Sequence, residues 1–255
     1  MSVLTLSDYL AVIWFVVAWF GFNILVEFKP LRQKTLSSAM ETYRHAWMAT
    51  MAERPVRIMD TSVMAGLQQG TAFFASTALI AIGGAFSLLN AADRIIQIAG
   101  DLAVPLAASR TEWEIKVLGL MLILAYAFFK FSWAYRLFNY GSIVMGAVPE
   151  CTPDNRDTVR AMARQAGNLN ALAGKHFNRG QRAFFFAIGF LGWFAGPLAL
   201  AVMTLAVLLV LIRRQFASAE KEAVLSTHQL AMLIAVGDGE NTAMGSSKPL
   251  TGKAP

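Results

Sequence analysis

The residues of this chain that could do chemistry are cations and amides set within or beside long apolar segments. Lys130 stands inside one such segment, and Arg136 follows near its end. Asn139 and Tyr140 come three and four residues after Arg136, so they share its helical face. Lys130 could extend to lipid headgroups or face a cavity between helices, and Arg136 could contact lipid phosphates or line a pocket for an anion. Aromatic neighbours also permit a cation–π contact at Lys130.

Further polar residues precede two other apolar segments, at what we expect to be the same end of the molecule. The helices that follow Asp60 and Arg182 should both begin there, and helix N-termini carry partial positive charge. Together these residues predict a cationic vestibule that contacts anionic lipid headgroups, a specific anion or a partner. The candidate contact residues are Arg57, Asp60, Lys130, Arg136, Asn139, Tyr140, Asn178, Arg179 and Arg182.

The sequence contains none of the common catalytic or metal-binding motifs. It has no Gly-x-Ser-x-Gly, His-Glu-x-x-His or P-loop pattern, and no paired carboxylates within its apolar segments. Cys151 is the single cysteine, which excludes a disulfide within the chain and a cysteine metal cluster. We therefore expect no catalytic residues, no metal and no cofactor, and the pattern argues against an enzyme.

The elements that must position the candidate residues are membrane-spanning helices. Of the 255 residues, 56% are hydrophobic and only 15% are charged, whereas soluble domains carry about 25% charged residues. We predict an all-α, polytopic helical membrane protein with four transmembrane helices and amphipathic flanking helices, because four apolar segments can cross about 30 Å of hydrocarbon. The transmembrane domain should cover residues 1–216, with spans at about 9–27, 62–89, 114–139 and 183–212.

Two of these spans are expected to be irregular. The third stays helical to about Val148, and its length of about 54 Å means that it must tilt, bend or project beyond the membrane. The fourth should be one helix kinked at Gly196-Pro197, because 30 residues are too few for two spans.

Amphipathic segments flank the spans. A capping box at Ser38–Glu41 predicts a helix that lies in the headgroup plane or docks on the bundle. Residues 217–236 should form an amphipathic C-terminal helix, and residues 237–255 have the composition of a disordered tail.

The Lys and Arg residues near the spans set the expected orientation, because cytoplasmic loops carry an excess of them. The first and third loops are the most basic, so we place both in the cytoplasm and both termini in the periplasm of a bacterial inner membrane. Arg213 and Arg214 conflict with this orientation, since they would then lie outside. Topology and anionic lipids explain the net charge of +6, and we expect no nucleic acid partner.

Three sequence blocks resemble the bacterial branch of the membrane-protein family catalogued as domain of unknown function number 599. They are "GTAFFASTALIAIGG" (Gly70–Gly84), "YAFFKFSWAYRLFNYGSIVMGAVP" (Tyr126–Pro149) and "FNRGQRAFFFAIGFLGWFAGP" (Phe177–Pro197). The resemblance implies a helical membrane protein with about four spans, and it implies no activity. Gln181 departs from the leucine-like residue expected at its position.

Our leading hypothesis is a non-enzymatic accessory or interaction protein that contacts anionic membrane lipids and could form a homo-oligomer or join a membrane partner protein. The alternative is an oligomeric channel or transporter for a small solute or ion, which rests on Lys130, Gln68 and Gln69 within apolar spans. A third hypothesis, a lipid-modifying enzyme, would need a contact between Asp60 and a histidine.

Overall fold

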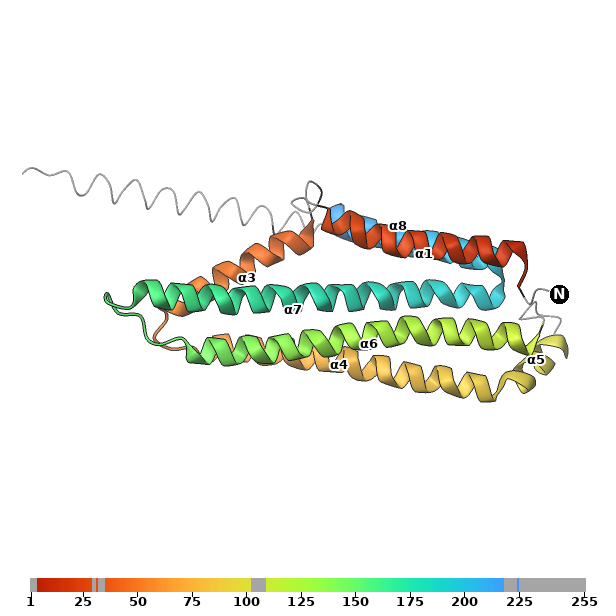
Figure 1. The fold of residues 1–255 in the computed structure, drawn as a ribbon, viewed down its shortest axis with the longest axis horizontal. Coiled ribbons are helices and arrows are strands. Elements are labelled where there is room, and N and C mark those ends of the chain that lie inside the picture. The colour runs from red at the N-terminus through yellow and green to blue at the C-terminus, as the bar shows by residue number, and fades with distance from the viewer. Residues whose placement is uncertain (1–3, 29–30, 32–34, 102–108, 218–223, 225–255) are drawn as a thin grey trace, which may run out of the picture.

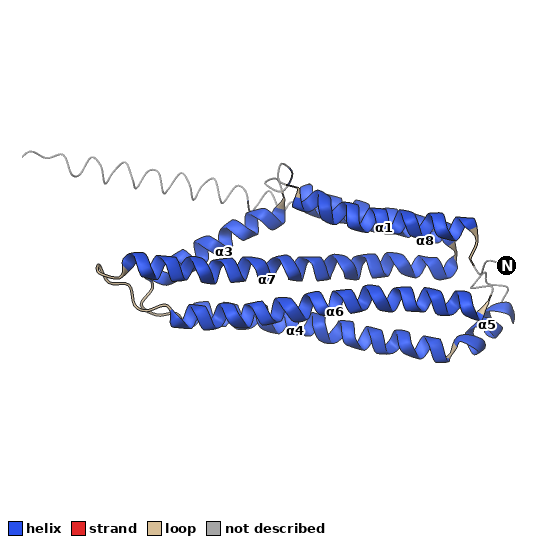
Figure 2. Ribbon diagram, in the orientation of Figure 1, coloured by secondary structure: helices blue, strands red, loops and turns tan. Residues whose placement is uncertain are grey.

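A computed structural model describes residues 4–28, 31, 35–101, 109–217 and 224, and every regular element in this part of the chain is a helix (Figures 1 and 2). The all-α prediction is therefore confirmed. The predicted C-terminal helix and tail fall almost wholly outside the described residues. The elements are α1 (Leu6–Glu27), α3 (Leu36–Glu53), α4 (Ile58–Asn90), α5 (Ala92–Asp101), α6 (Arg110–Ala147), α7 (Arg156–Phe190), the 3-10 helix η1 (Leu191–Ala195) and α8 (Pro197–Phe216).

Helices α1 and α8 lie side by side and run in the same direction (Figure 1). Near their starts, the Trp193 indole donates to the Asp8 carboxylate at 2.8 Å, and the Trp14 indole donates to the carbonyl of Ala201 at 3.3 Å. At the end of α8, the Gln215 amide donates to the hydroxyl of Ser37, in the first turn of α3, at 2.9 Å. The two helices have 22 and 20 residues, and lengths of about 33 and 30 Å match the hydrocarbon thickness.

The chain reverses direction between α7 and α8, so the prediction of one kinked helix over residues 183–212 is wrong. Gly196 has a φ of +125°, a conformation that L side chains rarely adopt, and Pro197 occupies the first helical position, which it favours. These two residues end one helix and begin another instead of bending one. Within the described residues, four helices are still long and apolar enough to cross a membrane, and the fourth is Pro197–Phe216.

Helix α7 is a fifth helix that passes through the membrane layer, by which we mean the slab that α1 and α8 are long enough to cross. Helix α6 runs from the end of the bundle that carries α5 (the α5 end) to the end that carries α3 (the α3 end), and α7 returns to the α5 end before α8 begins (Figure 1). Its first half is polar, which keeps it out of the set of apolar spans. A helix of this kind fits in a membrane because α6, α8 and α1 pack against it.

Helices α4, α6 and α7 extend past α1 and α8 at the α3 end, forming a projecting part (Figure 1). They have 33, 38 and 35 residues, which correspond to about 50 to 57 Å. The sequence predicted that the long third span, which is α6, would tilt, bend or project beyond the membrane. In the structure it projects. Helix α3 docks on α7 in this part. The core of the projecting part includes Met48 and Met51 of α3, Met64 of α4, Phe138 of α6 and Val159 of α7.

A second core, rich in aromatic rings, lies where the pair α1 and α8 packs against α7 and α6. Phe15 of α1 meets Phe186 and Phe190 of α7 edge-on, at centroid distances of 5.8 and 5.1 Å. Phe131 of α6 lies 5.4 Å from Phe74 of α4. These contacts fix α7 between α1 and α6, and α6 in turn against α4.

Buried charges hold the α5 end together. Asp8 and Lys116 are only 4% and 2% exposed. The Lys116 ammonium forms an ion pair with Glu112 at 2.6 Å and lies 5.6 Å from the centroid of the Trp193 ring, whose indole nitrogen donates to Asp8. Lys116 therefore has a carboxylate partner and Asp8 a hydrogen-bond donor, and the cluster connects α1, α6 and η1.

Because α7 adds a fifth crossing, the two ends of the membrane domain do not lie on the same side, contrary to the prediction from the sequence. The first residue of α1 and the last residue of α8 lie at opposite ends of the bundle (Figure 1), whereas the sequence placed both ends of the membrane domain on one side. Arg213 and Arg214, in the last turn of α8, now lie at the α3 end together with Arg54 and Arg57. The conflict between these two arginines and the other basic residues disappears.

We predict that residues beside the two ends of the membrane domain are accessible from opposite sides. In a protein whose Cys151 is replaced by serine, Ser7→Cys and Ala217→Cys should react with a membrane-impermeant maleimide from opposite faces of the membrane, because α1 and α8 are parallel. Thr152→Cys should behave like Ala217→Cys. Permeabilised membranes, in which all three react, provide the control. Labelling of Ser7→Cys and Ala217→Cys from one side would contradict the fold.

Candidate functional site

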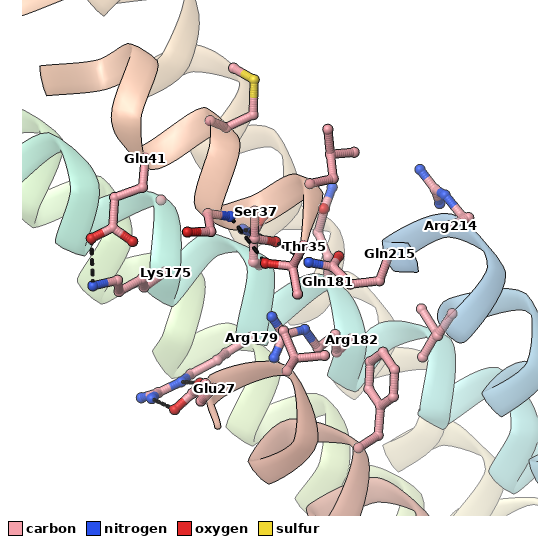
Figure 3. A pocket seen from close by; sticks show the side chains of 18 of the residues that line it. Glu27, Thr35, Ser37, Glu41, Lys175, Arg179, Gln181, Arg182, Arg214 and Gln215 are labelled. Carbon is pink, nitrogen blue, oxygen red and sulfur yellow. Dashed lines mark hydrogen bonds and ion pairs between the residues drawn. The ribbon is translucent and has the colours of Figure 1, made fainter. Parts of the chain in front are cut away.

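A cavity of about 440 Å³ opens where α1 and α8 end, between them, the first turns of α3 and the middle of α7 (Figure 3). Small-molecule sites commonly measure about 300–1,000 Å³. Five cationic side chains and two carboxylates line the cavity. Its position, level with the ends of two spans of membrane length, places it at the boundary between hydrocarbon and water.

Two of the cations are neutralised by carboxylates within the protein. The Arg179 guanidinium donates to both carboxylate oxygens of Glu27, at 2.8 and 2.6 Å. The Lys175 ammonium forms an ion pair with Glu41 at 3.0 Å. Figure 3 shows both pairs at the wall of the cavity. They tie α7 to α1 and to α3, and they leave no excess charge.

Two further arginines face the cavity without such a partner. Arg182 is 8% exposed, donates to the side-chain oxygen of Asn23 at 2.9 Å and stacks 5.8 Å from the Phe22 ring centroid. Arg44 donates to the side-chain oxygen of Asn170 and lies over the Phe138 ring. Among the described residues, neither arginine has a carboxylate within ion-pair distance.

Burial of these two charges is energetically unfavourable. Burial lowers the pKa of the Arg44 guanidinium, yet arginine stays protonated at any physiological pH. Amide oxygens satisfy some of the donors and aromatic faces contribute a weaker attraction, but neither supplies a negative charge. An anion in the cavity would supply it.

The first turn of α3 adds neutral donors to the cavity. Thr35 caps the helix, its hydroxyl accepting from the backbone N–H of Ser38 at 3.2 Å, so the helix begins three residues before the predicted capping box. Leu36 and Ser37 also line the cavity. Helix N-termini present free N–H groups and partial positive charge, and therefore attract anions.

Apolar side chains also line the cavity, next to the cations. Phe22 and Val26 come from α1, Phe185 from α7 and Leu211 from α8. At the rim, the exposed Arg214 guanidinium lies 5.6 Å from the Phe185 ring centroid. The cavity therefore offers both cationic and apolar side chains to the same occupant.

The family described as "Protein of unknown function, DUF599" matches residues 10–220, which includes the whole cavity. The chain belongs to this family. No curated protein and no solved structure matches the chain. Membership therefore confirms the resemblance without assigning an activity, and the geometry of the cavity has to carry the functional argument.

Three of the nine predicted contact residues line the cavity: Asn178, Arg179 and Arg182. Asn178 donates to the hydroxyl of Ser37 at 3.4 Å. All three come from one stretch in the middle of α7, not from the start of a fourth span as predicted. Their binding role stays a prediction.

Arg57 and Asp60 lie at the tip of the projecting part, far from the cavity. Arg57 donates to the carbonyls of Val148 and Pro149, which fixes the start of α4 to the end of α6. Asp60 is fully buried and accepts from Trp47 and Arg54 at 2.7 and 2.8 Å. The expected convergence fails because α4 begins beyond the layer. The contacts of Asp60 also do not include the histidine that a lipid-modifying enzyme would need.

The remaining four predicted residues lie along α6. The Lys130 ammonium stacks 5.0 Å from the ring centroid of Tyr126, one turn earlier. Arg136 is exposed between two rings, and its Nε donates to the Tyr140 hydroxyl at 2.7 Å. Asn139 is half-buried near them. None of the four is among the residues that line the cavity.

Sequence reasoning missed Arg44, Lys175 and the polar residues of the α3 start. Arg44 lies off the apolar stripe of its helix, which by itself suggests only an exposed face. Gly174 gives it room, because a Cβ there would lie 3.1 Å from Nε of Arg44. Gln181, which replaces an expected leucine-like residue, also lines the cavity. That departure was a further signal for a polar site, beside Asn178, Arg179 and Arg182.

We predict opposite effects on stability for two neighbouring arginines. Arg182→Met should melt at or above the temperature of the unchanged protein in phosphate-free detergent stripped of lipid, because it removes a buried charge that has no carboxylate partner. Arg179→Met should melt at a lower temperature, because it breaks a partly exposed bidentate ion pair. The expected loss in the free energy of unfolding is about 1 kcal/mol. A larger loss at Arg182 than at Arg179 would show that Arg182 is only a structural residue.

Proposed function

We propose that this chain is a non-enzymatic integral membrane protein that binds an anionic phosphate group in the cavity at its α3 end. The observation that carries the proposal is the pair Arg44 and Arg182, which face one cavity without a carboxylate partner. The phosphate could belong to a lipid headgroup or to a soluble compound, since both present the same chemistry.

Phosphate fits the donors better than other common anions. Guanidinium groups present planar forks of N–H donors that match the oxygen atoms of phosphate, and helix N-termini bind phosphate through backbone N–H groups. Both kinds of donor occur here, with Arg182 on α7 and the Thr35-capped start of α3 at one cavity.

We further propose that the α3 end faces the cytoplasm of a bacterial inner membrane and that the start of α1 faces the periplasm. The positive-inside rule supports this orientation. With α7 crossing the layer, the basic residues just before α4, in the first turns of α7 and in the last turn of α8 all lie at the α3 end. Cytoplasmic leaflets also present anionic lipids to that end.

A bound phosphate would contact α1, α3, α7 and α8 together. It would thereby strengthen the attachment of α3, which belongs to the projecting part, to helices of the membrane layer. This coupling supports an accessory or interaction role, in which the projecting part reaches into the cytoplasm. The channel alternative loses its main support, since Lys130 packs against Tyr126 of its own helix.

We predict that the cavity arginines determine phosphate binding. Purified protein should gain thermal stability on titration with vesicle-derived phosphatidic acid, phosphatidylglycerol or inorganic phosphate, and not with phosphatidylcholine. The double variant Arg44→Met, Arg182→Met should bind at least about tenfold more weakly, because a lost charge-assisted contact costs 1.4 kcal/mol or more.

Arg136→Met is the matched control, because it removes an exposed arginine outside the cavity and should leave binding unchanged. The lipid and inorganic phosphate arms distinguish the two sources. Equal loss of binding in the control and the double variant would indicate general attraction to a basic surface. No stabilisation by any anion would overturn the proposal.

A further inference from the structure

We infer that the occupant of the cavity is a lipid whose head carries a terminal phosphate, as a phosphate monoester or a diphosphate, and not a phosphate diester. This inference rests on the proposed function and specifies its ligand. It comes from the charge of the cavity, from the number of free donors and from the placement of apolar side chains.

The charge of the cavity calls for more than one negative charge. Of the five lining cations, two belong to the ion pairs described above, which leaves Arg44, Arg182 and Arg214. Arg214 is exposed at the rim and is screened by water, so the two more buried arginines set the requirement. A diester carries one negative charge. A monoester carries about 1.5 to 2 near pH 7, because its second pKa is about 6.

The donors that remain free suit the three terminal oxygens of a phosphate monoester better than the two of a diester. The hydrogen bonds of Arg44 and Arg182 to protein atoms each use only Nη1, so Nε and Nη2 of both groups have no partner among the described residues. The first turn of α3 adds backbone N–H groups. A diester offers two non-bridging oxygens, whereas a terminal phosphate offers three and can meet donors from α3 and α7 together.

The apolar wall indicates that the phosphate is attached to a lipid. Phe22 and Val26 of α1 and Leu211 of α8 line the side of the cavity next to two membrane-length helices. A volume of about 440 Å³ also exceeds that of a single phosphate, given that a water molecule takes roughly 30 Å³ in the liquid. A head with a terminal phosphate and the first part of a tail would contact both kinds of side chain.

The test compares two lipids with identical acyl chains in nanodiscs of phosphatidylcholine. At pH 7.5, phosphatidic acid, a monoester, should bind at least about tenfold more tightly than phosphatidylglycerol, a diester, a difference of about 1.4 kcal/mol. At pH 5 the preference should shrink, because the monoester gains a proton below its second pKa of about 6. Arg182→Met should remove most of the preference at pH 7.5, and Arg136→Met should retain it.

Phosphatidylglycerol controls for titration of the protein. Both lipids meet the same charged groups, namely Glu27 from α1, Glu41 and Arg44 from α3, Lys175, Arg179 and Arg182 from α7 and Arg214 from α8. Only the monoester changes its own charge between the two pH values. A preference that is the same at both pH values would therefore contradict the assignment to the phosphate's second proton.

The other outcomes separate this inference from the proposed function. Equal affinity for the two lipids at pH 7.5 would overturn the inference and leave phosphate binding intact, whereas binding of neither lipid would overturn both. Glycerol 3-phosphate provides the soluble arm. If it binds as tightly as phosphatidic acid, the lipid part of the inference is wrong.

Discussion

A membrane admits polar side chains at depth only where other protein segments cover them, and α7 is built on this constraint. Its arginines and asparagines lie in the same helix as the apolar residues that pack against Phe15 and Phe131. Helices α1, α3, α6 and α8 each pack on it. The parallel arrangement of α1 and α8, the projecting part and the cavity all follow from the position of this covered helix.

The two ends of the bundle treat buried charge differently. At the α5 end, Lys116 has Glu112, and Asp8 accepts from Trp193. At the α3 end, Arg44 and Arg182 have only amide oxygens and aromatic faces. The charge of Lys116 is therefore neutralised within the protein. Arg44 and Arg182 have no such carboxylate and line a cavity, where an anion could supply the missing charge.

Hydropathy could predict the three spans in α1, α4 and α6, because each is apolar over the whole thickness of the layer. It could not predict the crossing by α7, since that helix is half polar and draws its compatibility with the membrane from its neighbours. The dipeptide Gly196-Pro197 is equally compatible with a kink and a reversal. Only the positive φ of Gly196 and the packing of α8 on α1 decide for reversal. The site, too, was only partly predictable. Asn178, Arg179 and Arg182 follow one another along α7 and could be found in the sequence, whereas Arg44 joins them only through tertiary packing.

The proposed occupant of the cavity would also change the stability of the fold. Without a ligand, Arg44 and Arg182 lower the stability of the fold, because their charges are partly removed from water and lack a carboxylate. A phosphate would reverse the sign of that contribution, and it would do so at the junction of α3 with α1, α7 and α8. The free energy of binding would therefore appear as firmer attachment of the projecting part to the membrane layer. In the proposed function, binding of a lipid head would in this way be converted into the stability of the projecting part.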